Sequence, residues 1–231
     1  MPAVRGAGDA PVSAHERDAW DVGRRVVGID EVGRGAWAGP VTVAAVMLDP
    51  EHLPAGARDS KRLSPARREV VAAGVHRSAL VGLGHADNDE VDAIGLAAAL
   101  REAARRAFAA LMALPATPAD PLVLVDGPHD LLRLEGLEVT TLVRGDAASV
   151  SIAAASVVAK VDRDRRMGEA DPLHPAYGFA RNRGYASPEH LDALERLGPC
   201  ALHRRSWAPI ARLLQPTLGL GTSTSATGSG R

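Results

Sequence analysis

The chain has 231 residues, of which 46% are hydrophobic, 24% charged and 3% aromatic. These proportions are typical of a globular domain and exclude collagenous, coiled-coil and wholly disordered proteins. With a net charge of −1 and a single cysteine, Cys200, with no apolar run near the roughly 18 residues that a membrane span needs, and with no secretory leader pattern, the chain fits a cytoplasmic protein.

The predicted elements begin after a flexible tail over residues 1–22. Arg25–Asp30 and Val41–Leu48 are apolar runs that predict two strands joined by a short link. A helix starts at Ser64-Pro65, because the hydroxyl can cap it and the missing N–H of proline costs nothing at the first helical position.

The rest of the chain alternates between strand and helix patterns before a polar end. The further predicted elements are a strand at Ala79–Gly84, a helix at Asn88–Leu114, strands at Leu122–Asp126 and Glu138–Val143, a helix from about Ala147 to Arg166, and short helices near Pro188–Leu197 and Trp207–Leu214. The Gly/Ser/Thr tract over 219–231 is too polar to fold, so we predict one domain over 23–215 and a disordered tail over 216–231.

This order of elements predicts an α/β fold in which helices pack on both faces of a mixed sheet. Continuous apolar strands such as Leu122–Asp126 are typical of central strands covered on both faces. Ligands of open sheets of this kind collect at the carboxyl ends of the central strands. We therefore expect the functional site at these strand ends.

Acidic residues follow several of the predicted strands. Asp30 and Glu31 end the first strand, Asp126 ends a later one, and Asp146 comes shortly after the next. If these strands are parallel neighbours, their carboxylates meet and repel each other unless a cation neutralises them. Oxygen ligands favour Mg²⁺ or Mn²⁺, whereas the scattered histidines and the lone cysteine make zinc a poor fit. Two such ions could catalyse phosphodiester hydrolysis.

Each of these acids also has a simpler interpretation. An Asp followed by Gly at a strand end often serves turn geometry alone, and Asp146 before a helix is a natural N-cap. Asp162 and Asp164 alternate with arginines that include Arg163, and this pattern indicates a solvated helix face. From the residues alone, catalysis and structure remain about equally supported.

Six ordered blocks between residues 25 and 214 resemble the ribonuclease HII family, the type 2 ribonucleases H. The blocks are Val27 to Val46 (VGIDEVGRGAWAGPVTVAAV), Asp59-Ser60-Lys61, Val123 to Gly127 (VLVDG), Arg144-Gly145-Asp146 with Ile152 to Val161, Tyr177-Gly178-Phe179 with Gly184-Tyr185, and His203 to Trp207 (HRRSW). One Gly-Arg-Gly would be a weak match, but six blocks in order are specific.

The resemblance implies a ribonuclease H-like fold, with a five-stranded mixed sheet flanked by helices and a C-terminal helical extension. It also implies a Mg²⁺- or Mn²⁺-dependent endoribonuclease that cuts on the 5′ side of a ribonucleotide in RNA/DNA hybrids or in duplex DNA. The products would carry 3′-hydroxyl and 5′-phosphate ends, as ribonucleotide repair and RNA primer removal require. We expect a monomer, and a sliding clamp or other repair partner remains open.

Positions carried over from the family name the site. Asp30, Glu31, Asp126 and Asp146 become the catalytic metal ligands, and the N-cap interpretation of Asp146 gives way. The substrate-binding set comprises Gly33, Arg34 and Gly35 for the 2′-hydroxyl, which distinguishes RNA from DNA, Tyr185 for stacking on the sugar, and Lys61, Ser156 and Lys160 for phosphates. For Ser156 and Lys160, helix packing and a snorkelling lysine are the alternative.

The chain departs from the family pattern at two places, and two rival functions remain. Ala36-Trp37 stands where many relatives have Pro-Leu, and Asn182-Arg183 replaces a commoner His-Lys, which puts substrate contacts there in question. A related nuclease of this fold, such as a junction resolvase, would cut all-DNA substrates equally. A nucleic-acid binding module would bind the duplex and leave it intact.

Overall fold

The computed structural model describes residues 11–57, 60–115 and 117–215. The predicted disorder of 216–231, the first ten residues of the predicted N-terminal tail, and Asp59 lie outside this part. Its strands are β1 (Val26–Val32), β2 (Val41–Leu48), β3 (Ala79–Ala86), β4 (Leu122–Asp126) and β5 (Val139–Leu142). Its α-helices are α1 (Ala14–Asp21), α2 (Pro65–Ser78), α3 (Asn88–Ile94), α4 (Leu96–Met112), α5 (Gly145–Ala148), α6 (Val150–Ala170), α7 (Phe179–Asn182), α8 (Pro188–Leu197) and α9 (Ala208–Leu214).

Short 3-10 turns complete the chain at η1 (Ser60–Arg62), η2 (Asp171–Leu173) and η3 (Pro175–Tyr177). The five strands form one sheet in the order β3-β2-β1-β4-β5. β1 and β2 pair antiparallel, as do β2 and β3, whereas β1 with β4 and β4 with β5 are parallel. The prediction of a five-stranded mixed sheet is confirmed, and the parallel half brings the carboxyl ends of β1 and β4 together.

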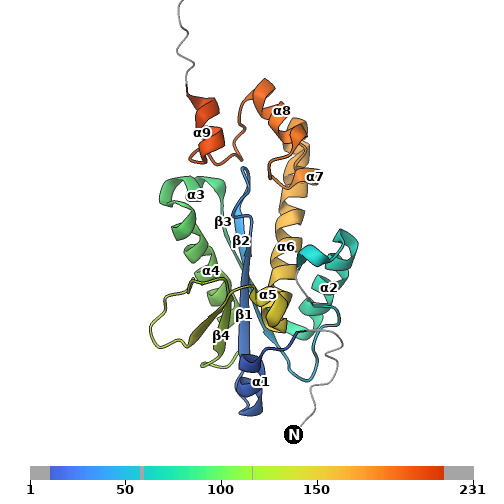
Figure 1. The fold of residues 1–231 in the computed structure, drawn as a ribbon, viewed down its shortest axis with the longest axis vertical. Helices are drawn as coiled ribbons and strands as arrows, with labels where there is room; N and C mark the ends of the chain where they lie inside the picture. Colours follow the sequence, from blue (N-terminus) through green and yellow to red (C-terminus); the bar gives the residue numbers. More distant parts are fainter. Residues whose placement is uncertain (1–10, 58–59, 116, 216–231) are drawn as a thin grey trace, which may run out of the picture.

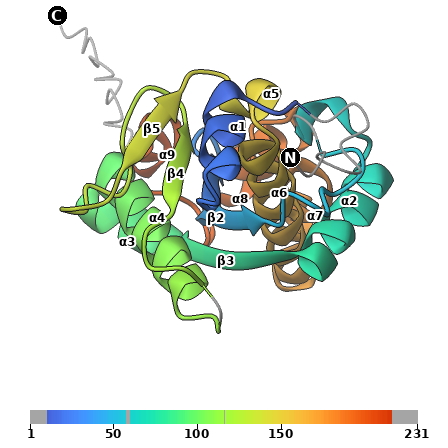
Figure 2. The ribbon, with the colours of Figure 1, turned by 90° about the horizontal axis from the view of Figure 1, so that it is seen from below.

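Helices cover both faces of the sheet (Figure 1). α3 and α4 lie on one face, and α2, α5 and α6 on the other, an arrangement that Figure 2 shows from below. One core, which includes Ile29, Val125 and Phe108, fills the space under α4. A second core, which includes Val46 and Val157, lies between the sheet, α2 and α6. Both are built mainly of Ala, Val and Leu, as the low aromatic content requires.

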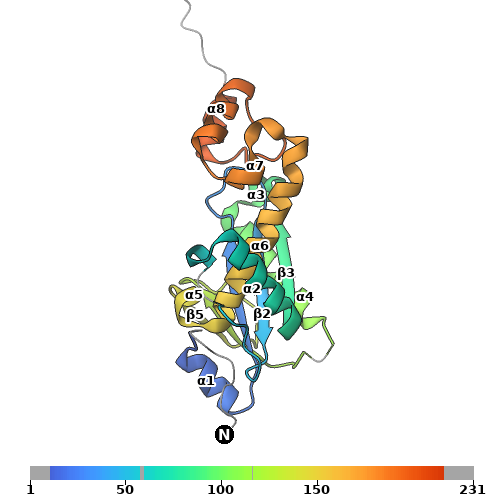
Figure 3. The same ribbon diagram turned by 90° about the vertical axis from the view of Figure 1, so that its right-hand side faces the viewer.

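α7, α8 and α9 form the predicted C-terminal extension at one end of the elongated molecule (Figure 3). Their core differs from that of the sheet because aromatic rings gather there, with Tyr177 and Phe179 stacked at 5.6 Å between centroids. In the described part of the chain, no helix combines the length and apolar character that crossing a membrane requires.

Two predicted helices are interrupted. The helix expected over Asn88–Leu114 breaks at Gly95, whose φ of +80° ends α3 and precedes α4. The helix expected from Ala147 instead begins at Gly145 and breaks at Ser149, which caps α6 by accepting a hydrogen bond from the Ile152 N–H. Glycine freedom and a local side-chain cap therefore override a continuous helical pattern.

The predicted tail over residues 1–22 is wrong for Ala14–Asp21, which form α1. Ser13 and Glu16 make a capping box at its start. The Glu16 Oε2 atom takes part in this capping box. The Oε1 atom accepts hydrogen bonds at 2.8 Å from the Ser149 hydroxyl and from the Ser151 N–H. This fully buried carboxylate fixes α1 to the first turn of α6.

Helix α6 packs closely on β1, the strand that carries Asp30. A Cβ atom added at Gly28 would lie 2.1 Å from the backbone carbon of Ser151. Only glycine therefore fits at this crossing, and α6 can approach the strand that carries Asp30 closely.

Candidate active site

Parallel pairing places the strand-end acids beside one another. β1 and β4 run in register up to Ile29 opposite Val125, so Asp30 and Asp126 come next at the same edge of the sheet. Asp126 pairs with Leu142 of β5, and the chain then turns into α5, which carries Asp146. The sheet topology thus gathers acids that lie up to 116 positions apart in sequence.

A cavity of about 330 Å³ opens at this edge. Ten of the eleven residues predicted for the site line it: Asp30, Glu31, Gly33, Arg34, Gly35, Lys61, Asp126, Ser156, Lys160 and Tyr185. Val32, Ser60 and Arg68 complete the lining. A neighbouring hollow of about 410 Å³ shares Glu31, Arg34 and Asp126 and extends toward the start of α4.

Asp30 is the most buried acid of the cavity, with 6% of its surface exposed. Its Oδ1 accepts a hydrogen bond of 2.7 Å from the Glu31 N–H. Burial raises the pKa of Asp30 well above its usual range, and the charges of Glu31 and Asp126 raise it further. The three acids therefore sense one another, as the crowding argument expects.

Glu31 follows Asp30 in β1, so its side chain starts on the opposite face of the sheet. It nevertheless lines the same cavity. Burial raises the pKa of Glu31, and the Asp126 charge acts in the same direction, while Arg34 opposes the shift. The Arg34 Nη1 donates to Glu31 Oε1 at 3.1 Å. Arg34 itself lines the cavity and stays largely exposed, so this ion pair joins an exposed cation to a buried acid.

Asp126 and Asp146 are held at the start of α5. Asp126 Oδ1 accepts a hydrogen bond of 2.7 Å from the Gly145 N–H. Asp146 is buried and does not line the cavity itself, but its Oδ2 lies 3.7 Å from Nζ of Lys61, which does. Arg144 occupies the N-cap of α5, so the N-cap interpretation of Asp146 is wrong.

The four acids offer only oxygen ligands, and their donor chemistry and crowded charge fit a hard divalent cation. Each carboxylate nevertheless faces a protein partner: the Glu31 N–H, Arg34, the Gly145 N–H or Lys61. Over residues 11–57, 60–115 and 117–215, no group of three or more His, Cys, Asp or Glu side chains stands ready to hold a metal ion. The acids share an edge of the sheet but are not arranged around a common point.

The Gly33–Gly35 turn forms another wall of the cavity, and its two glycines have different roles. Gly33 has a φ of +95°, and an added Cβ would lie 2.4 Å from Nε of Arg163. An added Cβ at Gly35 would meet no atom within 4 Å. Gly33 is required by the fold, whereas Gly35 keeps the cavity side of the turn open to a ligand.

Two buried arginines hold the chain that follows this turn. Arg204 Nη1 donates to the Arg34 carbonyl at 3.1 Å, and its Nε and Nη2 donate to the Gly39 carbonyl at 3.1 and 2.9 Å. Arg163 donates to the carbonyls of Pro40 at 2.8 Å and Ala38 at 3.2 Å. We call these two side chains and the carbonyls they bind the loop clamp.

The loop clamp contains two charges in the interior. Arg163 and Arg204 are fully buried, and burial lowers the pKa of Arg204 to about 10, so it stays charged at neutral pH. Neither forms an ion pair within the described residues; backbone carbonyls supply the hydrogen-bond partners instead. Arg163 was expected on a solvated helix face, and that prediction is wrong. Its position after Ser156 and Lys160, at i+7 and i+3, indicates the shared helix face that could have revealed it.

Tyr185 stands over this cationic side of the cavity. Its ring centroid lies 5.8 Å from Lys160 Nζ and 5.1 Å from Arg163 Cζ. The preceding carbonyl, of Gly184, accepts hydrogen bonds from the N–H groups of Trp37 at 2.8 Å and Ala38 at 3.2 Å. The segment that carries Tyr185 is thereby joined to the chain after the Gly33–Gly35 turn.

The predicted phosphate ligands differ in their surroundings. Lys61 is 83% exposed at the cavity rim. Lys160 donates to Asp164 at 2.6 Å, and burial lowers its pKa. Ser156 donates to the Ser60 hydroxyl at 2.9 Å. Asp164 is only 19% exposed, so it does not belong to a solvated face either.

The side chains at the positions that depart from the family pattern contact other parts of the protein and not the cavity. Asn182 accepts a hydrogen bond from the Gly184 N–H and donates to the Tyr177 carbonyl. Arg183 donates to the Asp164 carbonyl. Trp37 packs on the His190 ring at 6.3 Å between centroids. None of these three side chains belongs to the cavity lining.

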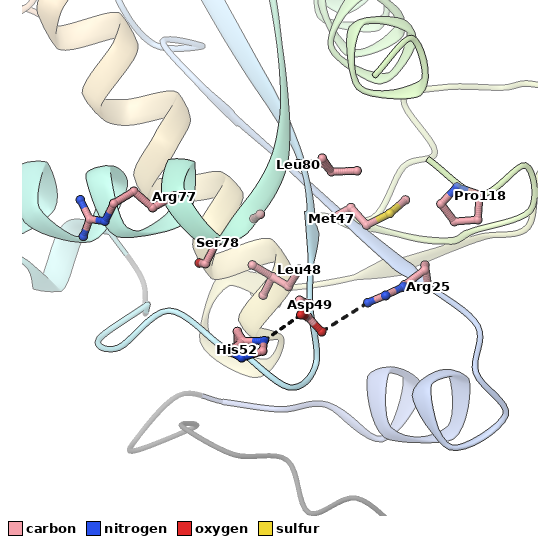
Figure 4. Close-up of a pocket in the computed structure, with 10 residues that line it drawn as sticks. Arg25, Met47, Leu48, Asp49, His52, Arg77, Ser78, Leu80 and Pro118 are labelled. Atoms are coloured by element: carbon pink, nitrogen blue, oxygen red, sulfur yellow. Dashed lines mark hydrogen bonds and ion pairs between the residues drawn. The ribbon is translucent and has the colours of Figure 1, made fainter. Parts of the chain in front are cut away.

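A larger cavity, of about 600 Å³, lies at the opposite end of β1 (Figure 4). Asp49 stands there between His52, at 2.8 Å, and Arg25, at 3.5 Å. Its lining contains one acid that is already paired with two basic groups and none of the predicted site residues. Size alone therefore does not locate the site.

Comparisons with known proteins agree with the motif analysis. The family model described as Ribonuclease HII matches residues 27–210. A Ribonuclease HII from Jannaschia sp. is 48% identical over 197 residues, which cover 84% of this chain and 94% of that protein.

Among solved structures, RNase HII in the PCNA:RNase HII complex from Archaeoglobus fulgidus superposes with a TM-score of 0.67 at 28% identity, covering 84% of this chain and 98% of that one. Bst-RNase HIII in complex with Mn²⁺ has a TM-score of 0.65 at 19% identity, covering 93% of this chain and 73% of that one. The second likeness concerns the fold alone.

Proposed function

The chain belongs to the ribonuclease HII family and is a ribonuclease H enzyme, and on that premise we propose that it hydrolyses, with Mg²⁺ or Mn²⁺, the phosphodiester on the 5′ side of ribonucleotides. Its substrates are RNA/DNA hybrids and duplex DNA that contains single ribonucleotides. The products carry 3′-hydroxyl and 5′-phosphate ends. The corresponding roles are ribonucleotide excision repair and RNA primer removal in the cytoplasm, by a monomer.

One observation carries this proposal: acids and the Gly33–Gly35 turn line the same cavity. Asp30, Glu31 and Asp126 supply negative charge at one side, and Tyr185 with Lys160 supplies a stacking and cationic surface at another. A phosphodiester needs the first for catalysis and the second for binding. The sugar next to that phosphodiester would lie against the turn.

Asp30, Glu31, Asp126 and Asp146 would hold the divalent cation. When bound, the ion supplies Lewis-acid activation of water and stabilises charge on the phosphate oxygens. The pKa of Asp30 is raised by burial and, in addition, by the charges of Glu31 and Asp126. A bound cation would offset this repulsion, which favours cation binding. An ion bound there would compete with Arg34 for the Glu31 carboxylate.

The remaining residues bind and orient the substrate. Gly35 leaves space where the 2′-hydroxyl and its sugar approach the backbone, and Arg34 is exposed enough to contact phosphate. Tyr185 presents its ring to the sugar. Lys61 at the rim and Lys160 at the base of the ring contribute positive charge, with Ser156 as a hydroxyl donor. Arg204 holds the turn through the Arg34 carbonyl, and Arg163 and Arg204 together hold the chain that follows it.

A labelled DNA duplex with one ribonucleotide tests the function directly. With Mg²⁺ or Mn²⁺ we expect one cut, on the 5′ side of the ribonucleotide, and no cut with a chelator. The all-DNA duplex of the same sequence should stay intact. Equal cutting of both duplexes would support a sugar-indifferent nuclease, and binding without any cut would support a binding module. Either result would overturn the proposal.

A clamp partner is a further part of the proposal. The solved neighbour from Archaeoglobus fulgidus is in a complex with PCNA, and we extend a sliding-clamp partner to this chain on that likeness. Size-exclusion chromatography of the full chain with and without the sliding clamp of its own organism tests this point. Separate elution of the two proteins would contradict it, and it would leave the catalytic proposal unaffected.

A further inference from the structure

Two fully buried histidines lie outside the cavity lining, and one of them, His190, contacts the Tyr185 carbonyl. His190 belongs to α8, and His203 lies on the segment that leads to α9. Their Nε2 atoms are 2.9 Å apart. The rings of Tyr177 and Phe179 pack against both of them, at 5.0 to 6.2 Å between centroids. The chemistry proposed for the acids uses neither histidine.

The surrounding hydrogen bonds determine where the protons of this pair lie. The Cys200 N–H donates to His203 Nδ1 at 2.9 Å, and the Cys200 carbonyl oxygen lies farther from this nitrogen, at 3.3 Å. The Tyr185 carbonyl can only accept from His190 Nδ1, which leaves His190 Nε2 to accept from His203 Nε2, so His203 Nδ1 carries no proton in the neutral ring. Neutral His203 is therefore protonated on Nε2 and donates to His190 Nε2. His190 must then carry its proton on Nδ1, which lies 2.9 Å from the Tyr185 carbonyl oxygen.

The result is a directed chain of hydrogen bonds that ends on the backbone of Tyr185. It runs from the Cys200 N–H through His203 and His190 to the Tyr185 carbonyl. Both histidines are neutral at pH 7, because burial lowers the pKa of His190 and lowers that of His203 to about 4. A second proton on His190 would place two N–H groups against each other.

The same pair also touches the chain that follows the Gly33–Gly35 turn. His203 forms a β-bridge with Ala38, and the Arg204 N–H donates to the Trp37 carbonyl at 2.9 Å. The Gly184 carbonyl accepts from Trp37 and Ala38 in turn. His203 thus sits where the Tyr185 segment and the turn segment join.

We propose that His190 and His203 are positioning residues that set the Tyr185 ring against the Gly33–Gly35 turn, so that stacking and sugar contact occur on the same nucleotide. The inference rests on the proposed function, because it gives Tyr185 a substrate to stack on. It predicts that loss of the pair weakens substrate binding through Tyr185, while the acids keep their chemistry.

The first test reads the tautomers in the unsubstituted full-length protein. Long-range ¹H–¹⁵N correlation spectra at pH 7 should show His190 protonated on Nδ1 and His203 on Nε2, each in a single tautomer. A His190 protonated on Nε2, or averaging between tautomers in either ring, would overturn the proposal. This test needs no variant to fold.

The second test is a double-mutant cycle on the single-ribonucleotide duplex. His203→Leu removes the donor to His190, and we expect KM to rise about three- to tenfold, the effect of one lost hydrogen bond, with kcat little changed. His203→Gln keeps an amide donor and should recover most of the loss. His174→Leu is the matched control, since His174 touches the Tyr177 and Phe179 rings but does not bond to Tyr185, and its KM should equal that of the parent.

The cycle is closed with Tyr185→Ala. If the histidines act through the ring, His203→Leu should not raise KM further once the ring is removed. An equal rise in KM in both backgrounds would show a general structural role and overturn the inference. If Tyr185→Ala alone leaves KM unchanged, the stacking role in the proposed function fails instead, while the tautomers are unaffected. The two failures are therefore distinguishable.

Discussion

The acids at the sheet edge and the loop clamp are both buried charged groups, but they are satisfied in opposite ways. Burial raises the pKa values of Asp30 and Glu31, and like charge adds to both shifts: from Glu31 and Asp126 for Asp30, and from Asp126 for Glu31. Arg163 and Arg204 direct their donors to backbone carbonyls at 2.8 to 3.2 Å. The crowded carboxylates are electrostatically unfavourable until a cation binds. The arginines of the loop clamp already have their hydrogen-bond acceptors within the protein. Catalytic chemistry and substrate geometry therefore depend on different residues and can be separated by mutation.

Neutralising one acid should give the largest effect, because it should abolish catalysis without lowering stability. For Asp126→Asn, or Asp30→Asn, we expect cleavage of the single-ribonucleotide duplex to fall about a thousandfold or more, because a metal ligand contributes several kcal/mol to the transition state. The thermal midpoint without metal should not fall, since a repulsive charge is removed. Asp120→Asn, at an exposed position before β4, is the control. Wild-type rates in either acid variant would contradict the assignment.

The loop clamp should show the reverse behaviour. Arg204→Met leaves the carbonyls of Arg34 and Gly39 without donors, so we expect a loss of about 3 kcal/mol in the free energy of unfolding. The exposed neighbour provides the matched control, Arg205→Met, whose stability should match that of the parent. Denaturant unfolding monitored by circular dichroism gives both values. Equal stability of the two variants would remove the structural role that we assign to Arg204.

Acidity should affect the metal-free protein through Asp30. Its folded-state pKa lies well above the usual 3.8, so the folded state binds the proton more tightly than the unfolded state. The resulting stabilisation is present at low pH and is lost as the pH rises through the raised pKa. We expect the thermal midpoint of the parent to fall relative to that of Asp30→Asn between pH 4 and neutrality. Parallel curves for the two proteins would contradict this expectation.

The smallest effect should separate the two glycines of the turn. Gly33→Ala places a Cβ in a positive-φ conformation against Arg163 and the Pro40 carbonyl, at an expected cost of more than about 1 kcal/mol in stability. Gly35→Ala meets open space, so its stability should be unchanged while KM rises for the ribonucleotide duplex. Thermal melts and steady-state kinetics measure the pair. A stable Gly33→Ala beside an unstable Gly35→Ala would reverse the assignment.

The strands, and the placement of Asp30 and Asp126 at one edge of the sheet, were accessible from sequence, because apolar strand patterns that end in an acid are local. Val41–Leu48 and Leu122–Asp126 are apolar runs whose bounds agree with the structure. Parallel pairing of β1 and β4 then brings Asp30 and Asp126 together without further information. The orientation of the carboxylates could not be predicted from sequence, since each one turns toward its own hydrogen-bond partner, such as Arg34 for Glu31.

The errors share a physical origin in hydrogen-bond partners that are distant in sequence. Glu16 reads as part of a charged tail, but its carboxylate is held by Ser149 and Ser151, more than 130 positions away. Arg163 reads as a surface residue, but its donors bind carbonyls of the loop at Ala38 and Pro40. Backbone acceptors leave no signature in side-chain composition, so a buried arginine of this kind is found only once the fold is known.

Binding of Mn²⁺ to the ¹⁵N-labelled protein tests the central claim, that the strand-end acids share a hard cation. Paramagnetic Mn²⁺ broadens amide signals near its site even when binding is weak. We expect loss of signal first at Glu31, Gly127 and Gly145, with no change near Asp49, and no such loss in Asp126→Asn. Broadening centred on Asp49, or an unchanged response in the Asp126→Asn variant, would contradict the account.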